Sequence, residues 1–252
     1  MNVKQYDSIY ISPHLDDAAL SCGGQIFEQT AVNQTVLIVT ITAGDPDEAA
    51  ISDYAQSLHS RWELVLNATA ARRAEDIEAC RILGADYLHW SVPDCIYRFD
   101  AATGAAYYLS DDDIFGNVHP GEMGLVEQLV AQLRQLPPAN RIFAPLAIGN
   151  HVDHQLARTA VEHVFGNEVI YYEDYPYAQE PGAVESVLPV GQRGWEAEVV
   201  VLSETAVHAK FNAIAAFKSQ LSTFFTDRAD LEQQVGGYIA QIGGERVWHK
   251  RL

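Results

Sequence analysis

Residues 35–42, with the sequence T-V-L-I-V-T-I-T, limit the fold of this chain more than any other stretch. The run is almost entirely β-branched or apolar, and the turn-forming residues 43–47 end it. Such a strand is typical of the centre of a parallel sheet, because helices cover both faces of these sheets. The segment therefore predicts an α/β protein with a buried, mostly parallel sheet.

Further strand and helix patterns alternate around this segment. Short apolar strands are predicted at residues 9–12, 87–90, 141–145 and 168–172, with an added strand at 197–202. Helices are predicted after Asp17 and at residues 52–83, 122–136, 151–164 and 205–224. This order is that of βαβ units. Because 48% of the 252 residues are apolar and no repeat or linker is visible, we expect one domain over residues 1–252.

The net charge and the number of cysteines limit the partners that the protein is expected to bind and the compartment in which it is expected. The formal net charge of −18 argues against nucleic acid or an anionic membrane surface as the main partner. No apolar run approaches the roughly 20 residues of a membrane span, and no secretory signal pattern is visible. The cysteines number three and form no CxxC pair, which disfavours a disulfide framework. We therefore expect a cytoplasmic protein without a membrane span.

Two clusters of histidine and aspartate each follow a predicted strand. His14, Asp16 and Asp17 come after the first strand, and the segment H-V-D-H at residues 151–154 comes after the strand at 141–145. Asp17 and Asn150 are the predicted caps of the helices that follow. Open α/β sheets bind ligands at the carboxyl ends of their strands. We therefore expect the two clusters to converge, although Asp17 and His154 are 137 residues apart.

The clusters contain what a catalytic zinc site needs, which is about three nitrogen or oxygen ligands and an open position for water. His14, Asp17 and His154 can supply the ligands, and the same set would also accept iron or cobalt. Either cluster alone is more often a helix cap beside a structural histidine. Their joint presence, each after an apolar strand, favours a metal site.

The remaining residues of the clusters suit hydrolysis of a carbonyl compound. Asp16 is free to act as a base on water. His151 lies one helical turn before His154 on the same side, where it could hydrogen-bond an oxyanion or protonate a leaving amine. Asp153 could orient one of the histidines, as carboxylates near metal sites commonly do.

Two other sequence patterns give weaker indications of function. The acidic run at residues 111–113 could bind a cation, but an exposed turn or helix cap is the commoner interpretation. Neither GxGxxG nor GxxxxGK[ST] occurs in the sequence, which disfavours a nucleotide-binding protein.

The two clusters also resemble the signatures of a known family. Residues 13–17 (P-H-L-D-D) resemble the [A/P]-H-P-D-D-E motif of PIG-L/LmbE-type zinc deacetylases, and residues 151–154 resemble their H-x-D-H motif. Weaker similarities span most of the chain: residues 72–75 with 83–84, Pro93-Asp94, residues 172–177, Lys210 and Ser219-Gln220. The resemblance implies a Rossmann-like, three-layer α/β fold that removes the acetyl group from an N-acetylglucosamine-type conjugate.

The resemblance also implies roles for individual residues. It makes His14, Asp17 and His154 the ligands of one zinc ion per chain and Asp16 the general base. It makes His151 the electrophilic or acid group, and it makes Asp153 the residue that tunes the reactivity of His151. It makes Arg72, Arg73 and Asp94 substrate contacts.

Two departures from the family motif bear on the substrate. Leu15 replaces the usual proline and Ala18 replaces the usual glutamate. Neither is an expected ligand, so the expected zinc site is retained while the sugar contacts stay open. The alternatives are a metal-dependent amidase acting on a thiol or other conjugate and a non-catalytic sugar-binding homologue. The expected partner is a small molecule, and a homo-oligomer is compatible with the sequence.

Overall fold

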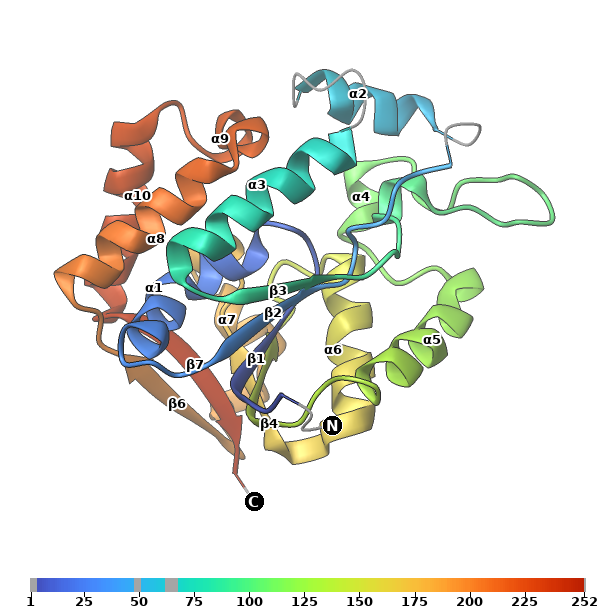
Figure 1. Cartoon of the computed structure of the whole chain (residues 1–252). Helices are drawn as coiled ribbons and strands as arrows, with labels where there is room; N and C mark the ends of the chain where they lie inside the picture. Colours follow the sequence, from blue (N-terminus) through green and yellow to red (C-terminus); the bar gives the residue numbers. More distant parts are fainter. Residues whose placement is uncertain (1–3, 48–50, 62–67, 252) are drawn as a thin grey trace.

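A seven-stranded sheet runs through the centre of the protein (Figure 1). The computed structural model describes residues 4–47, 51–61 and 68–251. The strand order is β3-β2-β1-β4-β5-β7-β6, and β1 to β5 are mutually parallel. The strands are β1 Tyr6–Ser12, β2 Val36–Thr40, β3 Asp86–His89, β4 Ala139–Pro145, β5 Val169–Tyr172, β6 Trp195–Val200 and β7 Glu245–Lys250. The predicted parallel sheet is confirmed.

The predicted central strand is buried on both faces, as its sequence requires. Every residue of β2 is buried, and its alternate side chains enter two different cores. Leu37 and Val39 pack on one face of the sheet, whereas Val36 and Ile38 pack on the other. This alternation follows from the two-residue period of a strand, and it explains the unbroken apolar run.

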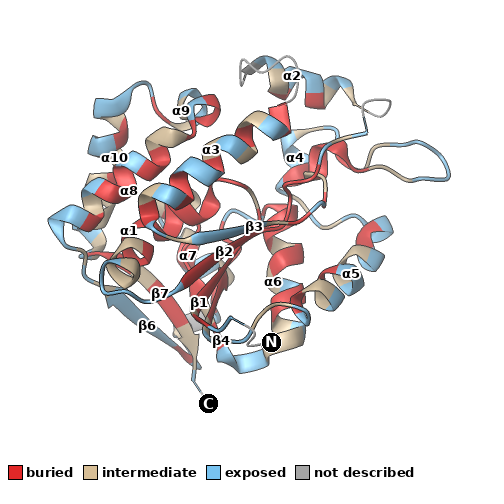
Figure 2. Cartoon of the chain, in the orientation of Figure 1, coloured by how far each residue is buried: buried red, intermediate tan, exposed pale blue. Residues whose placement is uncertain are grey.

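Helices cover both faces of the sheet and make the fold three-layered, as predicted. The helices are α1 Asp17–Ala31, α2 Asp53–Arg61, α3 Ala68–Leu83, α4 Asp111–Ile114, α5 Met123–Leu133, α6 Val152–Phe165, α7 Ala183–Val187, α8 Glu204–Ala216, α9 Lys218–Phe224 and α10 Arg228–Ile242. Buried residues of α1, α3, α8 and α10 form one core with the sheet, and those of α5, α6 and α7 form the other. Figure 2 shows the buried residues along the strands and the inner sides of the helices.

The C-terminal part differs from its sequence-based prediction. The predicted helix at residues 205–224 is two helices, α8 and α9, because Phe217 leaves the helical conformation at φ −81° and ψ 65°. The further helix α10 and the strand β7 were not predicted. The added strand predicted at residues 197–202 is β6, shifted by two residues, and it pairs antiparallel with β7.

The long helical segment predicted at residues 52–83 contains two helices in the described part, α2 and α3, and residues 62–67 between them lie outside it. A small core joins α2 to α4 and to the start of α6, above the carboxyl ends of the strands. This layer forms the outer wall of the cavity described below.

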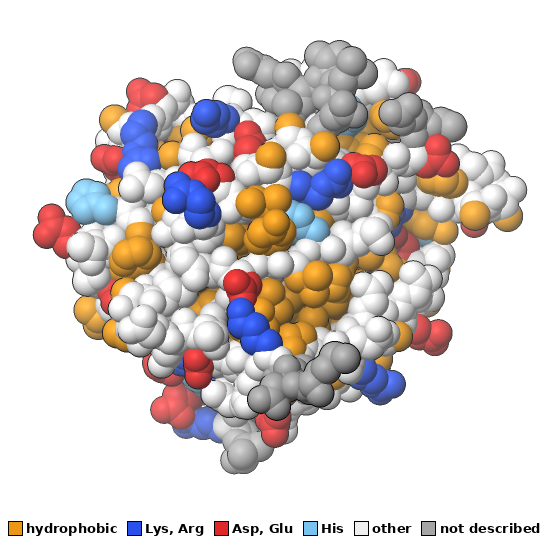
Figure 3. All heavy atoms as spheres, viewed as in Figure 1, with side chains coloured by type: hydrophobic (Ala, Val, Ile, Leu, Met, Phe, Trp, Pro, Cys, Tyr) orange, Lys and Arg blue, Asp and Glu red, His pale blue; other side chains and the backbone are white. Residues whose placement is uncertain are grey.

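One edge of the sheet carries exposed apolar side chains. The edge strand β3 exposes Tyr87 and Leu88, and the adjacent α3 exposes Ile77. Figure 3 shows hydrophobic side chains gathered over the middle of this face. Among the described residues, no helix has the length and apolarity needed to cross a bilayer.

Candidate active site

The first cluster lies in the turn between β1 and α1. The Asp17 carboxylate folds back and accepts a hydrogen bond from the His14 amide at 2.8 Å. The Ser12 hydroxyl tightens the turn by accepting from the Ala18 amide at 3.1 Å. Asp17 is therefore not the helix cap that its position predicted. Asp16 occupies the N-cap position without capping through its side chain, which leaves its carboxylate facing the cavity.

The second cluster lies in the turn between β4 and α6. His151, rather than the predicted Asn150, caps the helix, because its Nδ1 accepts from the Asp153 amide at 3.2 Å. Asn150 adopts a positive φ of 62° and donates through its side chain to the carbonyls of Phe115 and Gly116. The cap bond assigns the ring proton of neutral His151 to Nε2, because Nδ1 is the acceptor.

The two turns converge because β1 and β4 are neighbouring parallel strands. The Asp17 Oδ2 atom lies 3.2 Å from His14 Nδ1 and 3.2 Å from His154 Nε2. Ligand atoms on a tetrahedral zinc ion, with bonds of about 2.0–2.2 Å, stand roughly 3.3–3.5 Å apart. The two distances to Asp17 and the chemistry of the three groups are compatible with a divalent metal. One ring nitrogen from each of His14, His151 and His154 also lies within 4.8 Å of the other two.

Two buried carboxylates orient the histidines from behind. Asp174 Oδ1 lies 2.6 Å from His154 Nδ1, and Asp153 Oδ2 lies 3.1 Å from His14 Nε2. Arg98 in turn contacts the other Asp153 oxygen at 2.6 Å. The Asp153 carboxylate thus contacts His14, whereas the resemblance implied that it adjusts His151. Each histidine then turns its other nitrogen toward Asp17, which is the arrangement common around metal sites.

The charges around Asp17 favour a positive charge on its neighbours His14 and His154. Burial lowers the pKa of His154, but Asp17 and Asp174 outweigh it and raise the pKa to about 9. Burial likewise opposes protonation of His14, whereas Asp153 and Asp17 raise its pKa well above the ordinary value. The opposite holds for His151, whose pKa burial and the neighbouring His14 push well below normal. The carboxylates around Asp17 therefore form a site suited to a cation.

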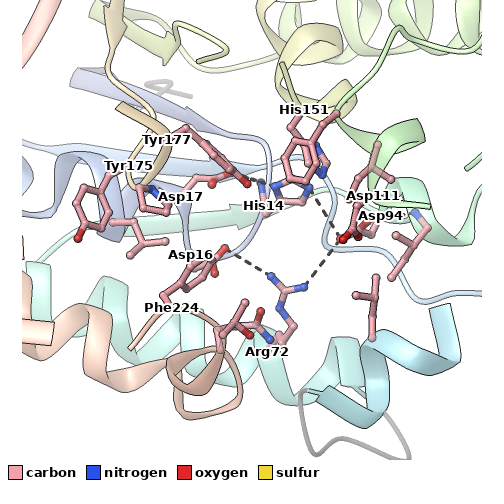
Figure 4. Close-up of a pocket in the computed structure, with 18 of the residues that line it drawn as sticks. His14, Asp16, Asp17, Arg72, Asp94, Asp111, His151, Tyr175, Tyr177 and Phe224 are labelled. Atoms are coloured by element: carbon pink, nitrogen blue, oxygen red, sulfur yellow. Dashed lines mark hydrogen bonds and ion pairs between the residues drawn. The ribbon is translucent and has the colours of Figure 1, made fainter. Parts of the chain in front are cut away.

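The cluster lies at the bottom of a cavity of about 290 Å³ (Figure 4). Arg72 lies between two of the carboxylates, with its guanidinium 3.5 Å from Asp16 Oδ1 and 3.9 Å from Asp94 Oδ2. Burial raises the pKa of Asp16, and the charge of Arg72 opposes that rise. Arg73 contacts the Ala43 carbonyl and the Asp45 carboxylate and is not among the lining residues. The structure thus brings Arg72 and Asp94 to the cavity but not Arg73.

Three residues near the site were missed by sequence reasoning. Asp174 follows β5 at the same sheet edge as the two clusters, so its position at a strand end could have identified it. Arg98 gives no such signal, because its pairing with Asp153 depends on tertiary structure. Asp111 belongs to the acidic run, where Ser110 caps the short helix α4. Its carboxylate lines the cavity and accepts from the Tyr54 hydroxyl at 2.5 Å.

Residues 9–165, which contain both clusters, match the family described as PIG-L, GlcNAc-PI de-N-acetylase. The chain belongs to the PIG-L family. The two departures from its motif lie away from the cavity lining: Leu15 and Ala18 are both buried in the core that α1 forms with the sheet.

Named relatives agree with this assignment. The chain is 27% identical to a 2'-N-acetylparomamine deacetylase of Niallia circulans over 264 residues, covering 98% of this chain and 92% of that protein. It is 30% identical to the enzyme of the same name from Streptomyces fradiae over 183 residues, covering 71% of this chain and 60% of that protein. Among solved structures, the zinc-inhibited form of teicoplanin deacetylase Orf2 is 27% identical, with a TM-score of 0.81 over 97% of each chain. The chain is therefore a hydrolase of the N-deacetylase class.

Proposed function

We propose that this protein is a divalent-metal-dependent deacetylase that hydrolyses the acetamide of an N-acetylglucosamine-type conjugate, with zinc as the metal. The observation that supports it most is that Asp17 Oδ2 lies 3.2 Å from both His14 Nδ1 and His154 Nε2, next to a cavity that Asp16 also lines. The relatives' names support an amino-sugar substrate, since they act on an acetylated paromamine and on teicoplanin.

His14 Nδ1, Asp17 Oδ2 and His154 Nε2 would hold the metal, with Asp153 and Asp174 fixing the two imidazoles. When bound, the ion would polarise the acetamide carbonyl and make water acidic enough to be deprotonated near neutral pH. Iron or cobalt would suit the same ligands.

Asp16 is the proposed general base. Its carboxylate borders the cavity next to the metal ligand Asp17, and it is not used as a helix cap. Burial raises its pKa toward the range in which a base works best, while Arg72 favours its ionised form. Asp16 would take a proton from the attacking water and pass it to the departing amine.

His151 is the proposed oxyanion donor. The sequence left two roles open for it, oxyanion stabilisation and protonation of the amine. The helix-cap bond at Nδ1 keeps the ring proton on Nε2, and a neutral imidazole is a weak acid but a good hydrogen-bond donor. We therefore assign His151 Nε2 to the developing oxyanion, with Arg72 and Asp94 as contacts of the sugar.

The test is a substrate panel assayed with the zinc-loaded protein. It should include neutral, amine-bearing and thiol-bearing N-acetylglucosaminyl conjugates and an N-acetylated non-sugar amide. We expect acetate and free amine to appear in equal amounts from the sugar conjugates, and His154→Ala to release neither. Preference for the non-sugar amide would favour the amidase alternative. Sugar binding without acetate release, with zinc present, would instead indicate a non-catalytic homologue.

A further inference from the structure

The outer part of the cavity is lined by acidic and aromatic side chains that have no role in the proposed hydrolysis. Its wall includes Tyr54 from α2, Asp111 and Phe115 from the α4 segment, and Tyr177. Phe115 joins this wall to the proposed reaction centre, since its ring is 5.4 Å from the His151 ring and 5.7 Å from the Tyr177 ring. A substrate whose acetamide reaches His151 would place its remaining part against this wall.

We propose that this remaining part carries a positively charged amine, which the Asp111 carboxylate binds. The inference rests on the proposed function, and it adds the class of conjugate, a cationic amino-sugar compound rather than a neutral or lipid-like one.

Asp111 is held in place for such a contact. It lies in the first turn of α4, and its Oδ1 accepts from the Tyr54 hydroxyl, 57 residues away in sequence, at 2.5 Å. Among the lysine and arginine side chains that the structure describes, which do not include Arg61, none forms an ion pair with Asp111. An anion fixed in a cavity wall without a cationic partner in this part of the chain favours a cation from the ligand.

The charges that line the cavity are unequal. The described lining has four carboxylates, Asp16, Asp17, Asp94 and Asp111, and one cation, Arg72. Arg72 lies between Asp16 and Asp94, and a metal would offset Asp17. The charge of Asp111 is then left for the ligand, and the net charge of −18 would attract cationic ligands at longer range.

The aromatic side chains of the wall strengthen the inference. Phe115 and Tyr54 line the same cavity as Asp111, Tyr54 contacts the carboxylate through its hydroxyl, and Phe115 is 37% exposed. Aromatic faces pack against the C–H faces of sugars and also attract ammonium groups. A purely lipid-like group would gain from the rings but would displace water from Asp111 without offering its charge a partner.

The experiment compares two N-acetylglucosaminyl conjugates that differ only in one aglycone substituent, a free amine or its uncharged N-carbamoyl form. For the wild type, we expect kcat/KM to favour the amine-bearing conjugate. In Asp111→Asn this preference ratio should fall about three- to tenfold, mainly through KM, because a partly screened ion pair is lost. High salt should reduce the wild-type ratio in the same direction.

Asp112→Asn is the matched control, because it removes the same charge from the next residue of α4, which does not line the cavity. Its preference ratio should equal that of the wild type. Equal ratios for the wild type and Asp111→Asn would overturn the inference while leaving the deacetylase assignment intact. The binding of the same two conjugates should also be measured by calorimetric titration, which reports the preference even if no acetate is released. Absence of acetate release would contradict only the proposed function.

Discussion

Asp16 and Asp17 are neighbours in the sequence, but their carboxylates face different partners. Asp17 is drawn toward His14 and His154, and those interactions push its pKa well below normal against the effect of burial. Asp16 faces Arg72 and the cavity, and burial raises its pKa. One turn thereby provides both a proposed ligand and a proposed base, and the sequence motif predicted this division.

Asp16→Asn tests the role of the base. The amide is nearly isosteric but cannot accept a proton, so we expect kcat to fall by about 10²–10⁴-fold. Zinc content, measured by elemental analysis, should equal that of the wild type, because Asp16 is not a proposed ligand. Full turnover in this variant would contradict the assignment of the base.

Asp174→Asn tests a residue that only the tertiary structure identified. It weakens the contact that orients His154, which is 2.6 Å away. Loss of such a contact typically costs about 10–100-fold in metal affinity. Competition with a coloured chelator would measure the affinity. Asp45→Asn, which removes an exposed carboxylate paired with Arg73, is the control and should bind zinc as the wild type does.

At the scale of elements, the sequence predicted the helices and strands that local patterns determine and missed those that depend on contacts with distant parts of the chain. The inner parallel strands were recognised because strands buried on both faces are continuously apolar, as in β2. Strand β7 was missed because its sequence, E-R-V-W-H-K, is mostly polar and its burial comes from pairing with β5 and β6. The break at Phe217 was missed because neither glycine nor proline marks it. The cap of α6 was misplaced because asparagine is the commoner cap, whereas His151 makes the bond.

The loops after β2 and β3 touch at a glycine, and this contact positions Asp94. Gly44 forms a bridge with Pro93, and a Cβ at Gly44 would lie 2.2 Å from the Ser91 carbonyl oxygen. Gly44→Ala should therefore displace the loop that carries Asp94 and lower the free energy of unfolding by about 1–3 kcal/mol. Urea denaturation and kcat/KM would measure the two effects.

Gly124→Ala is the matched control for this substitution. Nothing lies within 4 Å of a Cβ at Gly124, which is on helix α5. We expect stability to be unchanged or raised by up to about 1 kcal/mol, because alanine favours a helix. A loss equal to that of Gly44→Ala would show that steric contact between the loops is not the cause.

At the scale of the molecule, the proposed metal joins two halves of the sheet, through Asp17 after β1 and His154 after β4. A metal that binds only the folded state stabilises it by about 2.7 kcal/mol when its concentration is 100 times its Kd. We expect a chelator to lower the Tm of the wild type and to leave that of His154→Ala unchanged. Calorimetry would measure both, and a single transition would also test the predicted single domain. An equal chelator effect on the two proteins would argue against this ligand set.

The position of β7 also affects the order in which the protein can mature. Residues 245–250 follow every other strand of the described sheet in sequence, yet they form the strand between β5 and β6. Arg246 and Trp248 of this strand donate to Glu173, the neighbour of the Asp174 that orients His154. On the ribosome, the edge of β5 therefore stays open until residues 245–250 have emerged. Metal loading is then expected to follow synthesis of these residues, so that the hydrolytic centre is completed only after β7 has paired with β5.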